Sequence, residues 1–118
     1  MDDMKQFSQE EVEDLIKRFD IAVPFNKIIV TLNVYEDENG LISSEDGLDA
    51  EQYVIAAGPR SYLEEGTKVA LDIEKLLVKS TLPEDQYQQT TSLQIKTVEF
   101  EGYKFGLIDD SKVEYFYK

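Results

Sequence analysis

The first regular apolar pattern in the chain predicts a short amphipathic helix over residues 8–19. Its apolar residues occur at spacings of i, i+3, i+4 and i+7, which place them on one face of a helix. They are Val12, Leu15, Ile16 and Phe19. Ser8 and Glu11 fit a capping box, in which hydroxyl and carboxylate satisfy backbone N–H groups of the first turn. The apolar face is expected to pack on the helix's own domain or, alternatively, to dock on a neighbouring subunit or partner.

From Pro24 onward the pattern changes to that of short strands. Pro24 keeps Val23 out of helical geometry and so separates the helix from the strands after it. Six segments rich in β-branched and aromatic residues are bounded by turn residues, which is typical of strands. They are residues 27–34, 52–57, 68–71, 93–100, 103–108 and 113–117. Such a series with glycine-marked turns predicts a small barrel or sandwich.

Three further segments complete the pattern. Residues 73–81 have helical spacing in part and an apolar run typical of a buried strand in part, so both interpretations stay open. Residues 83–92 are polar and predict a loop, and residues 35–49 are polar and acidic with two turn signals. No linker divides the chain. We therefore expect one domain over residues 23–118, preceded by an N-terminal helical extension over residues 1–22.

Charge narrows the classes of partner. The 118 residues carry a formal net charge of −13, and no Lys or Arg lies between Lys27 and Arg60. Such a surface repels phosphate groups, so we expect neither nucleic acid nor an anionic membrane as a partner. The acidic stretch is either a solvated loop or a segment steered toward a basic partner. With no long apolar run, no secretory-signal pattern and no cysteine, the expected location is the cytoplasm.

The chain is poor in residues that carry chemistry. It has no histidine and no cysteine, so the usual nucleophile–base pairs and zinc sites cannot form. It also lacks a glycine-rich phosphate-binding motif. With 25 acidic residues, chance carboxylate pairs are abundant and no pair stands out as an acid/base site. The sequence predicts no catalytic residue, no metal ligand and no cofactor, and hence a protein that is not an enzyme.

One apolar feature interrupts the acidic stretch. Gly40, Leu41 and Ile42 place two large aliphatic side chains in the middle of a polar segment. They either fold back onto the domain or point outward as an anchor that fills a groove on a partner.

Read in order, several segments resemble the GroES family of co-chaperonins (chaperonin-10-like). A proline-led opening strand, a strand ending in Ala-Ala-Gly-Pro, a glycine turn with its strand, a closing hairpin and a terminal strand all have similar counterparts in that family. They are residues 23–30, 53–59, 63–69, 98–105 and 109–113, and the resemblance covers roughly two thirds of the chain in the family's order.

The resemblance implies a mainly β fold, a small GroES-like partly open β-barrel with the short N-terminal amphipathic helix added. Residues 35–49 fall where the family carries its mobile loop, and Gly40, Leu41 and Ile42 align with the residues that bind the chaperonin apical domain. The implied function is that of a homo-oligomeric, seven-fold ring that caps a chaperonin folding chamber, here of a divergent phage-encoded type in the host cytoplasm.

Three departures from the family favour an alternative. Ser43 replaces the third aliphatic residue of the loop motif, the N-terminal helix is additional, and the insertion over residues 73–97 is long. The alternative is a phage structural, decoration or assembly protein that reuses the barrel in the virion, with capsid or other virion proteins as partners.

Overall fold

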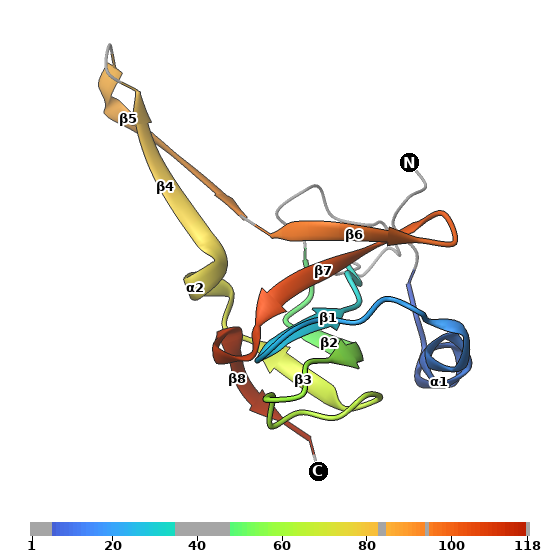
Figure 1. Cartoon of the computed structure of the whole chain (residues 1–118). Coiled ribbons are helices and arrows are strands. Elements are labelled where there is room, and N and C mark those ends of the chain that lie inside the picture. The colour runs from blue at the N-terminus through green and yellow to red at the C-terminus, as the bar shows by residue number, and fades with distance from the viewer. Residues whose placement is uncertain (1–5, 35–47, 83–84, 94, 118) are drawn as a thin grey trace.

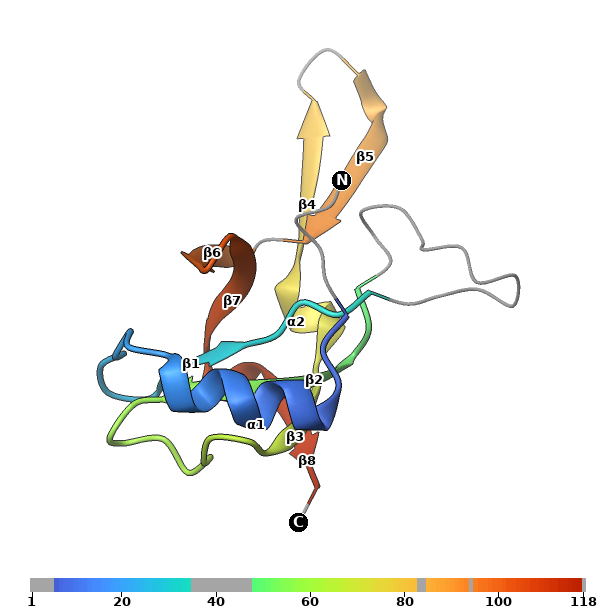
Figure 2. The same ribbon diagram turned by 90° about the vertical axis from the view of Figure 1, so that its right-hand side faces the viewer.

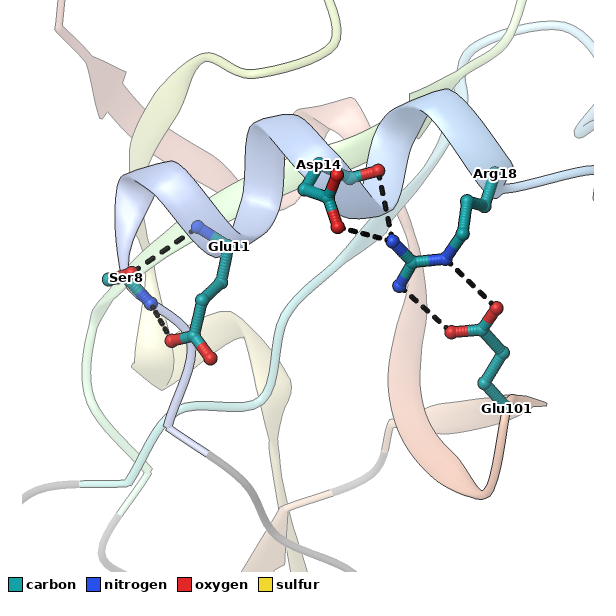
Figure 3. Close-up of polar contacts among 5 residues, drawn as sticks. All are labelled: Ser8, Glu11, Asp14, Arg18 and Glu101. Atoms are coloured by element: carbon teal, nitrogen blue, oxygen red, sulfur yellow. Dashed lines mark hydrogen bonds and ion pairs between the residues drawn. The ribbon is translucent and has the colours of Figure 1, made fainter.

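The structure, a computed structural model, describes residues 6–34, 48–82, 85–93 and 95–117, and for residues 77–93 it describes the backbone alone. Helix α1 (Gln9–Arg18) forms where the sequence predicts it. The capping box is present: Ser8 Oγ accepts a hydrogen bond from Glu11 N at 3.3 Å, and a Glu11 carboxylate oxygen accepts one from Ser8 N at 3.1 Å (Figure 3). Val12 and Leu15 are buried within the chain. Of the two interpretations of its apolar face, packing on the helix's own domain is therefore confirmed.

A six-stranded antiparallel sheet makes up the body of the fold, in the order β6-β7-β1-β2-β3-β8 (Figure 1). The strands are β1 (Lys27–Val30), β2 (Glu51–Ala57), β3 (Lys68–Leu71), β6 (Lys96–Phe100), β7 (Tyr103–Asp109) and β8 (Val113–Phe116), with a 3-10 turn η1 (Asp110–Lys112) before β8. The mainly β prediction is confirmed. Within the described residues β6 and β8 each pair on one side, so the sheet is not closed.

A second, two-stranded sheet corrects the prediction for the insertion. Residues 73–82 form a short helix α2 (Ile73–Leu76) followed by β4 (Leu77–Leu82), so each of the two open interpretations holds for one half. The loop predicted over residues 83–92 is wrong, because β5 (Asp85–Leu93) pairs antiparallel with β4. Its residues are mostly polar and show no alternation of apolar and polar positions, which is why the sequence indicates a loop there. The ribbon stands away from the sheet (Figure 1).

Strand limits differ from the predictions at two other places. The strand predicted over residues 93–100 is divided, since Leu93 ends β5 and β6 begins at Lys96. The strand predicted over residues 27–34 ends at Val30, where the pairing with β2 shifts register between Ile29 and Val30. Beyond this irregularity Thr31 N still donates to Tyr53 O, but Asn33 N donates to the Gln52 side chain and Val34 N to the Gln6 side chain.

Apolar side chains gather on both faces of the sheet, because Ile29 belongs to one cluster while Ile28 and Val30 belong to the other. The first cluster comprises Ile28, Val30, Val54, Leu63, Val69, Leu71, Leu76, Ile108 and Val113. The second comprises Phe7, Val12, Leu15, Ile29, Ile55, Ala56 and Phe105. Helix α1 covers the second face, where it lies against β2 (Figure 2). The N-terminal segment is thus one wall of the core.

Candidate partner-binding segment and its base

The predicted partner-binding residues Gly40, Leu41 and Ile42 lie within residues 35–47, outside the described residues. What the structure gives is the place where this segment leaves the sheet and returns to it. We call residues 31–34 and 48–52 the base.

The two sides of the base lie against each other. Val34 and Leu48 form an antiparallel bridge, and Asp49 N donates to Asn33 O at 3.0 Å. Val34 is buried. The residues on either side of 35–47 are therefore held at the separation of a strand pair.

Gln52 joins the two sides through a buried amide. Its Oε1 accepts from Thr31 Oγ1 and from Asn33 N, both at 2.8 Å. Its Nε2 donates to Asn33 O at 2.8 Å and to Asp49 O at 2.6 Å. A primary amide has two acceptor and two donor positions, and all four are used here. Since the Gln52 and Thr31 side chains are fully buried, this network is protected from competition by water.

The N-terminal segment reaches the same base. The Gln6 side chain brackets the peptide groups of Val34: Nε2 donates to Val34 O, and Val34 N donates to Oε1, both at 2.7 Å. The Asn33 side chain forms the same pair of hydrogen bonds with Phe7: Phe7 N donates to Oδ1 at 2.8 Å, and Nδ2 donates to Phe7 O at 3.1 Å. Residues 6–7 and 33–34 are thus joined by two reciprocal amide pairs.

Aromatic side chains hold both ends of α1 on the sheet. Phe7, before the helix, has its ring centroid 5.4 Å from that of Phe105, and Phe19, after the helix, has its centroid 5.9 Å from the same ring. Phe7 also contacts Tyr103, and Phe19 contacts Phe100. Because Phe105 is fully buried, both ends of α1 rest on one fixed side chain of β7.

A charged contact ties the C-terminal end of α1 to the turn between β6 and β7. The Arg18 guanidinium donates two hydrogen bonds to the Glu101 carboxylate, at 3.0 and 2.9 Å, and also contacts Asp14 (Figure 3). The hydrogen bond from Arg18 lowers the pKa of Glu101 below its ordinary value. Glu101 and Gly102 both have positive φ angles, of 54° and 84°, as in a type I′ hairpin turn. This turn presents Glu101 to the helix.

A second feature lies at the β8 edge of the sheet. Four large aromatic residues there are between 41% and 55% exposed, and we call them the edge aromatic cluster. They are Tyr62, Tyr115, Phe116 and Tyr117. The Tyr62 and Phe116 rings lie 5.6 Å apart, and the Tyr115 and Tyr117 rings 5.8 Å apart.

The cluster includes a polar contact. Tyr117 Oη donates to the Glu51 carboxylate, which also pairs with Lys68 Nζ at 3.2 Å. The Tyr117 hydrogen bond, and secondarily that of Lys68, lowers the pKa of Glu51, and the same bond raises the pKa of Tyr117. Exposed aromatic side chains at the open edge of a sheet are typical of a surface that meets another protein.

None of the base residues was predicted from the sequence to support a functional segment. Gln52 stands two residues before Val54, on the same face of β2, so an amide at an inward position was the available signal. Asn33 and Gln6 give no such signal, because each is a polar residue next to a segment boundary.

The described residues contain no group of three or more acidic, histidine or cysteine side chains able to hold a metal ion. Within the same residues, no helix has both the length and the apolar character needed to span a membrane. No protein-family model matches the sequence, and comparison with curated proteins likewise finds no match.

Proposed function

We propose that the protein is a co-chaperonin-like cap of a chaperonin folding chamber, built on a GroES-like partly open β-barrel. In this proposal it assembles as a homo-oligomeric ring, and Leu41 and Ile42 supply the apolar contact with the chaperonin apical domain, while Gly40 allows the turn that displays them. It works by contact and catalyses no reaction.

The observation that carries the proposal is the base. A short apolar anchor binds best when the chain on either side of it starts from a fixed position, because less conformational freedom is then lost on binding. Gln52 and the Val34–Leu48 bridge supply such a fixed origin for the segment that holds Leu41 and Ile42. The edge aromatic cluster supports the assembly part of the proposal, since an open edge and exposed rings suit contact with a neighbouring subunit.

A second candidate is a phage virion structural, decoration or assembly protein with capsid or other virion proteins as partners. The β4–β5 ribbon favours it, because an arm that stands away from the sheet is suited to reach a neighbouring molecule (Figure 1). For such a protein the edge aromatic cluster is again an assembly surface, and the location is the virion.

The experiment measures molar mass by light scattering, for the protein alone and for the protein with a bacterial chaperonin and nucleotide. A ring of about seven subunits that co-elutes with chaperonin only in the presence of nucleotide is the expected result. A monomer, dimer or trimer indifferent to chaperonin overturns the proposal and favours the virion protein.

A double substitution, Leu41→Ser with Ile42→Ser, tests the anchor. It is expected to abolish co-elution with chaperonin while leaving the circular dichroism spectrum and the ring mass unchanged. The matched control is Ser44→Ala in the same segment, which is expected to leave co-elution intact. Unchanged binding of the first variant refutes the anchor assignment, and its unfolding shows that the two aliphatic residues belong to the core.

A further inference from the structure

We infer that residues 6–19 form a clasp whose docking on the sheet fixes Val34 of the base, so that helix α1 and Val34 order and loosen together. The clasp comprises Gln6, Phe7, helix α1 and Phe19. The inference concerns the protein alone and does not depend on the proposed function.

The base needs the clasp because the chain has left the ladder of β1. Buried backbone N–H and C=O groups require partners, and beyond Val30 the β2 strand no longer supplies all of them. The Gln6 side-chain amide forms hydrogen bonds with both the N–H and the C=O of Val34. The Asn33 side chain is fixed in turn by Phe7. When the clasp leaves the sheet, these four hydrogen bonds are lost together.

Docking of the clasp is close to all-or-none. A helix of 10 residues is marginal in water by itself, so α1 persists through its contacts with the sheet. Those contacts lie along its whole length: Phe7 at one end, Val12 and Leu15 in the middle, and Phe19 with Arg18 at the other. Loosening of the Arg18 end therefore reaches the Gln6 end through one cooperative element, which is the physical requirement for coupling between distant places.

Two separate sets of hydrogen bonds hold the base, one from Gln52 and one from Gln6. Gln52 is fully buried and holds Thr31, Asn33 and Asp49 from within the domain, independently of the clasp. Gln6 is exposed and belongs to the clasp. Release of the clasp thus leaves the two sides of the base paired while freeing Val34, the last described residue before residue 35. If the proposed function holds, partner binding that displaces Val34 and docking of α1 are linked in both directions.

The test is hydrogen exchange followed residue by residue in the full chain. In Arg18→Ala, at the far end of the clasp, the amide of Val34 is expected to exchange about tenfold faster together with those of α1, whereas the amide of Asp49, which donates to Asn33 O within the base, is expected to change less. In Asn33→Ala, at the base, the α1 amides are expected to exchange faster by a similar factor. Amides of Val54 and Val69 in the central strands report on global unfolding and are expected to keep their rates.

Two further variants make the result specific. Asn33→Asp keeps an acceptor for Phe7 N but places a carboxylate oxygen against Phe7 O, so the α1 amides should exchange at least as fast as in Asn33→Ala. Gln9→Ala removes an exposed amide of α1 and should leave the base amides within about twofold of wild type. Faster exchange in α1 of Arg18→Ala with Val34 unchanged overturns the inference. Equal acceleration of every amide, Val54 and Val69 included, also overturns it, because it assigns the effect to global stability.

Discussion

Replacing Gln52 by leucine removes the buried amide while nearly preserving side-chain volume. Three groups lose their partner: the Thr31 hydroxyl hydrogen, the Asn33 N–H and the Asp49 carbonyl. The Asn33 carbonyl keeps its hydrogen bond from Asp49 N. The substitution therefore isolates the cost of unsatisfied polar groups from the cost of a cavity.

The size of the effect depends on burial. An unpaired buried polar group costs about 1–3 kcal/mol. Thr31 is fully buried, whereas Asn33 and Asp49 are half-buried and reach some water, so the lower end of the range applies and the sum is about 3 kcal/mol. The apolar leucine returns roughly 1 kcal/mol by burial. The expected loss is thus about 2 kcal/mol, a large part of the total stability of a small domain.

Urea denaturation followed by circular dichroism and tyrosine fluorescence measures this loss. A decrease of about 2 kcal/mol moves the urea midpoint by roughly 1 M. Gln52→Ala leaves the same groups unpaired and adds a cavity, so its loss should be larger, about 3–4 kcal/mol. Gln9→Leu, on the exposed side of α1, is the control and should stay within about 0.5 kcal/mol of wild type. A Gln52→Leu protein as stable as wild type would refute the reasoning, because the amide network would then make no net contribution.

Two other predictions concern the backbone and the surface charge. Gly58→Ala should lower the free energy of unfolding by at least about 2 kcal/mol, because the added Cβ would lie 2.2 Å from Phe25 O. Gly102→Ala should lower it by less in the same urea denaturation experiment, because the space around its Cβ is open and only the positive φ of 84° opposes the substitution. The lowered pKa of Glu101 stabilises the fold above the ordinary value of 4.5, and this contribution disappears as pH falls through the lower folded-state pKa. The stability difference between wild type and Glu101→Gln should therefore shrink below about pH 4, and a difference that stays constant from about pH 6 to pH 3 would contradict the assignment.

The elements that the sequence predicted correctly are those with local signals. The Ser8–Glu11 capping box and the apolar stripe locate α1 to within one residue at each end, because both depend on neighbouring positions alone. The β-branched run at Lys27 and the turn at Gly66, with φ of 87°, are equally local. Pairing order is not local, and the six-stranded order with β1 between β7 and β2 came from the structure.

The elements that the sequence missed depend on distant partners. Polar β5 is a strand because β4 lies beside it, and nothing within its own residues requires that. The base depends on Gln6, Asn33 and Gln52, which are far apart in the sequence and whose amides are common at the surface of any protein. Their role appears only when the fold places the N-terminal segment, the end of β1 and the start of β2 side by side.

The tie between Arg18 and Glu101 has a consequence for synthesis of the chain on the ribosome. The two residues are 83 positions apart, so the helix leaves the exit tunnel long before the turn that receives it exists. At about 5–20 residues per second, that interval is on the order of 4–17 s. Strand β1 likewise lacks one of its neighbours during this interval, because the paired strand β7 ends only at Asp109. During this interval Phe105 is still missing from the cluster in which Val12 and Leu15 are buried, so a chaperone that recognises apolar segments has time to bind this part of the nascent chain.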